Sequence, residues 1–141
     1  MTVTKKRKPS IRLPDKPSEL IDVALADLRK AEKDGCMIDM GEWHVPFDGS
    51  CSVCAAGAVM RRGVSDNLEV GPSYFNETTD NKLCAIDQLR VGFVYEALVM
   101  LEIPRAGVVV KNCEITHYDY DRTKFYRDLR RLAARLRKAG L

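Results

Sequence analysis

The residues best suited to chemistry gather in one short stretch, WHVPFDGSCSVCAAGAVM, which covers residues 43–60. It holds His44, Cys51 and Cys54, and imidazole and thiolate groups are zinc ligands in proteins. Two cysteines separated by two residues can reach one ion from a turn or from the first turn of a helix. A fourth ligand could come from another sulfur or imidazole: Cys36, Cys84, Cys113 or His117. We predict that a metal site here would consist of His44, Cys51, Cys54 and Cys84.

A cysteine nucleophile is a second interpretation of the same stretch. The segment GSCSVCAAGA resembles the loop and helix start that carry the nucleophile in papain-like cysteine proteases. The resemblance implies a thiolate at a helix N-terminus and a base such as His117, oriented by Asp119. The sequence lacks the aromatic residue that follows the nucleophile in that family, and its 141 residues are few for that fold. We therefore expect no cysteine-hydrolase activity and rank this function third.

Packing is the third interpretation, and we favour it for residues 55–60. Cysteine behaves as a small hydrophobic residue and is often buried. The small side chains of Ala55, Gly57 and Ala58 would let another element approach closely, with Trp43 packed nearby. Under this interpretation the protein has no cofactor, and zinc is the one alternative that the residues leave open.

These residues need helices and short strands to hold them in place. Apolar side chains recur at helical spacing, and Ser50, Thr79 or Asp80, and Thr123 are suitable N-cap residues. Runs of β-branched and aromatic residues instead predict strands. We expect helices over residues 17–31, 51–62, 81–102 and 124–140, and strands over residues 36–40 and within 106–121. The predicted fold class is α-rich α+β, with three to four main helices and a few short strands.

Charge is distributed unevenly along the chain, whose net charge is +3. Basic residues are concentrated in residues 1–16 and 122–141, whereas residues 17–121 hold an excess of acidic side chains. Residues 1–16 also contain prolines and lack hydrophobic periodicity, so we predict a flexible basic arm. Residues 17–141 suffice for a single globular domain, which we expect to end in a basic amphipathic helix.

The expected C-terminal helix carries a narrow apolar seam: Phe125, Leu129, Leu132 and Leu136. Spacings of three and four residues place these side chains on one face of a helix. The seam must be buried against the protein's own core or against a second copy, so the sequence leaves a homodimer open. Basic residues beside the seam and in the arm form our predicted partner-binding set: Lys5, Lys6, Arg7, Lys8, Arg127, Arg131 and Arg135.

Membrane and secretory signals are missing from the sequence. No apolar run approaches the ~20 residues that a membrane span needs, and no apolar segment follows the first basic residues. We therefore expect a cytoplasmic protein with reduced thiols, and an odd number of cysteines, five, also argues against a closed set of disulfides. Neither a phosphate-binding glycine loop nor a nucleic-acid-binding fold signature is present in the sequence.

Two segments, DMGEWHVP and CSVCAAGAVM, resemble a pattern in small bacteriophage-encoded proteins. The resemblance covers roughly residues 18–95 and leaves the basic arm and the C-terminal helix outside. It implies a phage setting, and hence the cytoplasm of a bacterial host cell. We therefore expect a non-enzymatic binding protein that engages a host macromolecule, such as an inhibitor of the host-takeover or anti-defence type. A host protein is the expected partner, and nucleic acid bound through the basic ends is the alternative.

Overall fold

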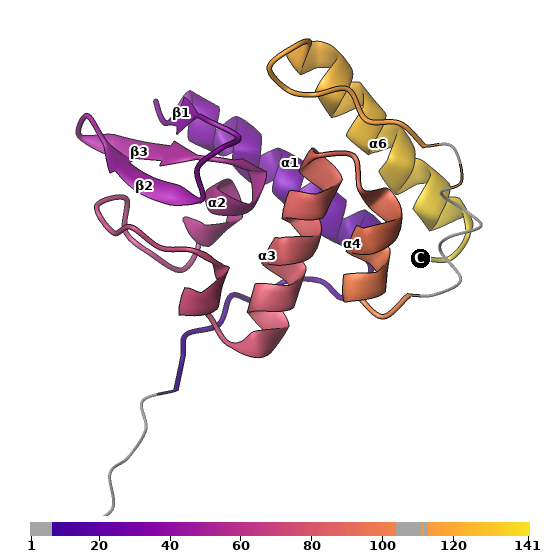
Figure 1. Cartoon of the computed structure of the whole chain (residues 1–141), viewed down its shortest axis with the longest axis horizontal. Coiled ribbons are helices and arrows are strands. Elements are labelled where there is room, and N and C mark those ends of the chain that lie inside the picture. Colours follow the sequence, from indigo (N-terminus) through magenta and orange to yellow (C-terminus); the bar gives the residue numbers. More distant parts are fainter. Residues whose placement is uncertain (1–6, 104–110, 112) are drawn as a thin grey trace, which may run out of the picture.

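The computed structural model describes residues 7–103, 111 and 113–141. These residues form a small α-rich α+β domain (Figure 1), which confirms the predicted fold class. The helices are α1 (Pro17–Lys33), α2 (Ala55–Met60), α3 (Glu77–Arg90), α4 (Val94–Met100) and α6 (Arg122–Lys138), and a short 3-10 helix, η1, spans Pro72–Tyr74. The strands are β1 (Met37–Ile38), β2 (His44–Phe47) and β3 (Ser50–Val53).

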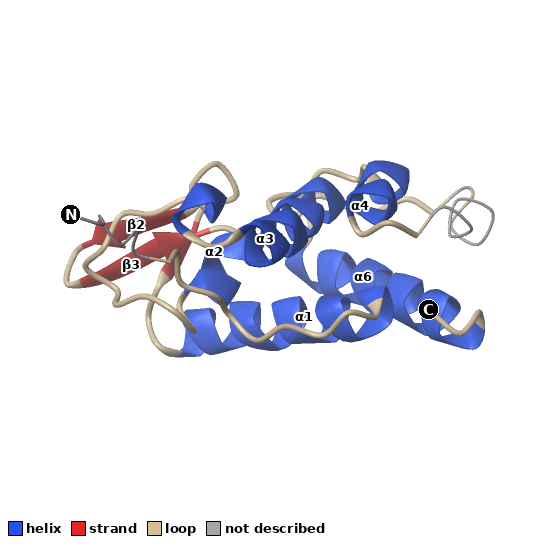
Figure 2. Cartoon of the chain, turned by 90° about the horizontal axis from the view of Figure 1, so that it is seen from below, coloured by secondary structure: helices blue, strands red, loops and turns tan. Residues whose placement is uncertain are grey.

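α1 is the helix around which the rest of the domain packs. Pro17 occupies its first turn, and Leu20, Ile21 and Leu28 on its apolar face are buried. α2, α3 and α6 all pack against it. Gly35, with a φ of 86°, follows the helix and turns the chain toward β1. Figure 2 shows the sheet at one end of the molecule and the long helices extending away from it.

The three strands form a sheet in the order β1-β3-β2, with β1 parallel and β2 antiparallel to β3. β1 lies within the strand predicted over residues 36–40. Asp48 and Gly49 join β2 to β3 with φ values of 46° and 79°, the left-handed pair that a two-residue hairpin turn requires. The helix predicted from Cys51 is wrong at its start, because this turn directs β3 back along β2. α2 begins only after Cys54.

The single helix predicted over residues 81–102 is divided into α3 and α4. The break falls at Gly92, whose φ of 86° ends α3 and lets the chain turn. α3 also begins earlier than predicted, because Asn76 is its N-cap and accepts a hydrogen bond from the backbone N–H of Thr79 at 3.0 Å. α3 and α4 each bury one side in the core and expose the other.

α6 packs against α1 through the predicted seam. Its four seam residues are at most 5% exposed: Phe125, Leu129, Leu132 and Leu136. The seam therefore meets the protein's own core. The N-cap is Asp121, which accepts a hydrogen bond from the backbone N–H of Lys124 at 3.0 Å, in place of the predicted Thr123.

Residues 7–16, the described part of the arm that we predicted to be flexible, pack against α3. Ile11 and Leu13 are buried, and the backbone N–H of Ile11 donates to Oγ1 of Thr79 at 3.2 Å. These two apolar side chains account for the difference, because their burial favours a docked segment. Residues 1–6 lie outside the described residues.

The strand predicted within residues 106–121 falls partly on residues that lie outside the described ones. The described residues 113–121 contain no strand and lead as a loop into α6. The backbone N–H of Thr116 donates to Oδ2 of Asp128 at 2.8 Å. The loop is thus held by a side chain of α6 rather than by a neighbouring strand.

Candidate metal centre

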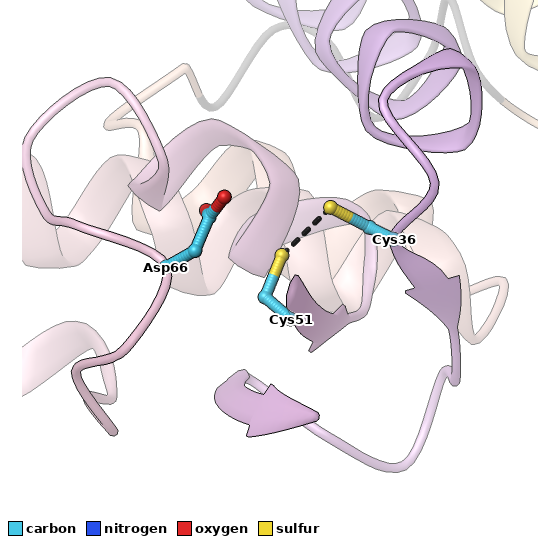
Figure 3. Close-up of side chains that lie close together, drawn as sticks. All are labelled: Cys36, Cys51 and Asp66. Carbon is cyan, nitrogen blue, oxygen red and sulfur yellow. Dashed lines mark hydrogen bonds between the residues drawn. The ribbon is translucent and has the colours of Figure 1, made fainter. Parts of the chain in front are cut away.

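Three side chains converge beside the sheet and could hold a metal ion (Figure 3). The sulfur atoms of Cys36 and Cys51 and a carboxylate oxygen of Asp66 all lie within 4.8 Å of one another. Cys36 lies in the link between α1 and β1, Cys51 in β3, and Asp66 in the loop after α2. Thiolate and carboxylate groups are both ligands of zinc in proteins, so the donor set fits such an ion.

Backbone contacts fix the positions of the two cysteines. The backbone N–H of Cys36 donates to the carbonyl oxygen of Ala31 at 2.9 Å, which holds Cys36 against the end of α1. Cys51 pairs with Pro46 across the hairpin, and its side chain is fully buried. The two Sγ atoms are 2.8 Å apart, and both residues are free thiols.

Arg61 holds the third member of the group in place. Its Nε donates to Oδ1 of Asp66 at 3.0 Å, and its Nη2 donates to Oδ2 at 3.4 Å. A further bond from Nη1 to Oδ2 of Asp34, at 3.1 Å, ties the same guanidinium to the end of α1. The hydrogen bonds from Arg61 lower the pKa of Asp66, so its carboxylate is ionised at neutral pH.

The thiol of Cys51 is poorly suited to act as a nucleophile. Burial, together with the hydrogen bond to Cys36, raises the pKa of Cys51 to about 12. A nucleophilic cysteine needs a lowered pKa and access to a base. His117, the predicted base, lies in the loop before α6, where its Nδ1 accepts a hydrogen bond from the backbone N–H of Asp119 at 3.2 Å.

His44 lies beside the group and is fully buried. Its backbone is held in β2, opposite Val53. Its Nδ1 is 2.7 Å from the carbonyl oxygen of Leu68, and its Nε2 is 3.9 Å from Oδ1 of Asp66. In the described parts of the chain, Nε2 of His44 is the one buried side-chain nitrogen or oxygen without a hydrogen-bond partner.

Of the four predicted metal ligands, Cys51 belongs to this group and Cys54 does not. His44 lies outside the group and approaches it at Asp66. Cys54 is the N-cap of α2, and its Sγ accepts a hydrogen bond from the backbone N–H of Gly57 at 3.4 Å. A Cβ at Gly57 would lie 1.5 Å from the carbonyl oxygen of Trp43, so only glycine fits there. Every residue of α2 is buried, in agreement with the packing interpretation of this helix.

Cys84, the fourth predicted ligand, is tied to its own helix. Its Sγ donates to Oδ1 of Asp80, one turn earlier in α3, at 3.2 Å. Cys36, one of the alternatives to Cys84, belongs to the group instead. Nothing in the sequence pointed to Asp66, because a lone aspartate in a long loop has no spacing that marks it as a ligand.

α4 and its N-cap residue expose four large apolar side chains, which together we name the apolar α4 surface. Its members are Phe93, Tyr95, Val99 and Met100, which are 54%, 57%, 51% and 39% exposed. The opposite side of the helix is buried through Val94, Ala97 and Leu98. α4 is therefore firmly packed, and the exposed cluster lies on its outward side.

α6 carries an exposed row of basic side chains, which we name the basic α6 row. Successive members are three or four residues apart: Lys124, Arg127, Arg131, Arg135 and Lys138. Among the ion pairs between described residues, none involves this row. The other predicted partner-binding residues precede α1: Arg7 is exposed, Lys8 donates to the carbonyl oxygen of Ser73, and Lys5 and Lys6 lie outside the described residues.

Comparisons with protein-family models, with curated proteins and with solved structures found no match for this chain. Within the described residues, no helix combines the length and the apolar character that a membrane crossing requires. Function is therefore inferred from the metal centre and from the two surfaces on α4 and α6.

Proposed function

We propose that the protein is a non-enzymatic binding protein that engages a host protein through the apolar α4 surface. The exposure of four large apolar side chains on α4 and at its N-cap carries this proposal. Apolar groups clustered on the surface of a soluble domain commonly mark a site of protein binding. Tyr95 combines a large ring with a hydroxyl group, a chemistry enriched at the centres of interfaces.

Acidic side chains border the apolar α4 surface and define the chemistry of the partner. Glu96 is exposed on α4 itself, and Glu102 follows the helix. Glu77 lines the same hollow as Met100, where Asp15 is already paired with Lys82. The complementary partner is a protein surface with an apolar centre and a basic rim. The resemblance to phage-encoded proteins supports a bacterial host protein, met in the cytoplasm and inhibited by binding.

Capture from bacterial lysate treated with nuclease tests the proposal, using the full-length protein and two matched variants. Tyr95→Ser combined with Val99→Ser removes two neighbouring side chains of the apolar α4 surface, one turn apart, and leaves the buried side of the helix intact. Phe47→Ser is the control, because Phe47 is 46% exposed on β2, away from α4. We expect one host protein to be captured even after nuclease treatment. The Phe47→Ser variant should still capture it, and the double variant should not.

Two results would contradict this proposal. Capture that persists with the double variant would show that the apolar α4 surface is not the binding site. If the wild type sediments as a dimer and the double variant as a monomer, the surface binds a second copy of this chain.

Nucleic acid is the second candidate partner, and the basic α6 row favours it. Side chains of this kind contact phosphates, so binding would weaken steeply with salt. Replacing Arg131 and Arg135 with alanine should then abolish the capture of nucleic acid, and nuclease treatment should abolish it too. The double variant of α4 should capture nucleic acid as the wild type does. The excess of acidic residues over residues 17–121 opposes a broad nucleic-acid surface, so we rank this candidate second.

We also propose that zinc is the ion held by Cys36, Cys51 and Asp66. Two thiolates select a soft or borderline ion such as zinc over magnesium or calcium. Elemental analysis of protein purified without chelator tests this assignment. We expect one zinc per chain. Protein that is purified without zinc and binds none when zinc is added would refute the assignment.

A further inference from the structure

We propose that Nε2 of His44 is the fourth ligand of the ion, which completes a closed zinc site with Cys36, Cys51 and Asp66. This inference rests on the proposal that zinc occupies the group of two cysteines and one aspartate. It goes further, because it fixes the complete ligand set and the role of the metal in the fold.

The hydrogen bond of Nδ1 determines which ring nitrogen of His44 is available. Nδ1 lies 2.7 Å from the carbonyl oxygen of Leu68, and a carbonyl oxygen can only accept. Nδ1 must therefore carry a proton, so Nε2 is the ring nitrogen that can offer a lone pair to a metal ion. Histidines that bind metals typically donate their other ring N–H to a backbone carbonyl in this way.

The surroundings of Nε2 lack a protein donor for that lone pair. His44 is 0% exposed, and Nε2 has no hydrogen-bond partner among the described residues. A buried polar atom without a partner costs about 1–3 kcal/mol, so such an atom calls for an occupant. Nε2 lies 3.9 Å from Oδ1 of Asp66, which is itself a member of the metal group. His44 is not among the side chains whose ligand atoms all lie within 4.8 Å of one another, so the four side chains must draw together around the ion.

The charges of the centre balance when zinc is bound. On binding, each thiol releases its proton to solvent, so Cys36 and Cys51 become thiolates beside the carboxylate of Asp66. The zinc ion and the guanidinium of Arg61 together offset these three negative charges. Arg61 already holds the carboxylate through two hydrogen bonds, as partners of ligating carboxylates commonly do.

The sulfur atoms must separate when the ion enters. They are 2.8 Å apart in the structure, whereas zinc–sulfur bonds of about 2.3 Å in a tetrahedron place two thiolates about 3.8 Å apart. A side-chain rotation can supply this outward movement of about 1 Å. The zinc–sulfur bonds then replace the present contact between the two thiols. Since all four positions belong to the protein, the site is structural rather than catalytic.

Cobalt(II) and zinc titration of the full chain tests the fourth ligand. The wild type should show a thiolate-to-cobalt charge-transfer band and the intense d–d bands of a tetrahedral ion. His44→Gln should keep the charge-transfer band, weaken the d–d bands as water replaces the imidazole, and lower zinc affinity by at least about 100-fold. Cys84→Ser is the matched control, because Cys84 bonds Asp80 on its own helix, and it should behave as the wild type.

Each other result overturns a defined part of the proposal. A wild-type cobalt spectrum in His44→Gln would remove His44 from the ligand set and leave zinc on the remaining group. A wild type that binds neither metal, or one that is purified with a Cys36–Cys51 disulfide, would refute the zinc assignment as well. The α4 binding proposal depends on neither result.

A second measurement covers the case in which His44→Gln fails to fold, since His44 is buried. In wild-type protein loaded with cadmium, NMR of the labelled imidazole should show scalar coupling between the metal and Nε2. Ring signals that do not change on metal loading would overturn the assignment of His44.

Discussion

At the residue scale, the chemistry of the centre depends on which side chains hold protons. Burial raises the pKa of Cys51 to about 12, whereas hydrogen bonds from Arg61 lower the pKa of Asp66. Nε2 is the ring nitrogen of His44 that can offer a lone pair to a metal ion, because Nδ1 donates to the carbonyl oxygen of Leu68. An incoming metal ion therefore has to displace thiol protons, but it finds the carboxylate of Asp66 already ionised.

We expect zinc affinity to increase as pH rises through the neutral range. Thiol protons are products of binding, so each one released contributes up to about a tenfold gain in affinity per pH unit below the thiol pKa. Competition with a chromophoric chelator at several pH values measures this slope. A flat profile would show that the thiols of Cys36 and Cys51 are not ligands.

Asp66→Asn should reduce the loss of stability on acidification in zinc-free protein. The folded-state pKa of Asp66 is below its ordinary value of 3.8, so its pairing with Arg61 stabilises the fold above that value. This stabilisation is lost as pH falls through the folded-state pKa. Denaturant unfolding of both proteins in chelator, from neutral to acidic pH, measures the difference. Parallel curves would show that the pairing with Arg61 contributes nothing.

At the element scale, two close contacts hold the domain together, one between the sheet and α2 and the other between α1 and α6. α2 meets the backbone before β2 at Gly57, where no side chain fits. α6 lies on α1 through a seam of four buried apolar side chains. The contact at Gly57 leaves no space for a side chain, and the seam depends on buried apolar area, so both should be sensitive to substitution.

Gly57→Ala should destabilise the protein by more than about 3 kcal/mol, because the new Cβ would meet a backbone oxygen of Trp43 that cannot move aside. Gly71→Ala is the control: its Cβ would meet Trp43 at an ordinary 3.8 Å, and the φ of Gly71 is −117°. Chemical denaturation measures both. Equal effects of the two substitutions would contradict the close approach at Gly57.

Leu132→Ala should cost about 2–5 kcal/mol of unfolding free energy, since it opens a cavity in the contact between α6 and α1. Leu132 is 2% exposed, whereas its neighbour Arg131 is exposed and belongs to the basic α6 row. Arg131→Ala should therefore change stability by no more than about 0.5 kcal/mol. Thermal and denaturant unfolding of the two variants measures both effects. An equally small loss of stability in Leu132→Ala and Arg131→Ala would contradict the buried seam.

At the scale of the whole molecule, the proposed metal site joins segments that secondary structure alone leaves weakly connected. Its ligands come from the link before β1, from β2, from β3 and from the loop after α2. β1 has only two residues, so the sheet end has few hydrogen bonds of its own. The helical end is held instead by the core that α1 shares with α3 and α6.

Removal of zinc should therefore lower the melting temperature and loosen one end of the protein. Free zinc at one hundred times its dissociation constant would stabilise the fold by about 2.7 kcal/mol, and a chelator would remove this contribution. Hydrogen exchange should accelerate in β1–β3 and in the loop that contains Asp66, while α6 changes little. Uniform acceleration along the chain would contradict a local role for the metal.

The sequence by itself determined the features that depend on local periodicity. Apolar residues at spacings of three and four predicted α1 and the buried seam of α6, because a helix places such positions on one face whatever surrounds it. His44 and Cys51 were also recognisable as candidate ligands, because their chemistry is visible in their residue types. Their membership of one site stays a prediction that the metal titrations test.

Only the tertiary structure decided which residues meet. A two-residue turn made residues 50–53 a strand rather than a helix start, and this brought Cys51 against Cys36 while Cys54 became the cap of α2. Asp66 reaches the centre from a loop because Arg61 holds it there. Contacts between distant segments depend on strand pairing and on the course of loops, and neither leaves a periodic pattern in the chain.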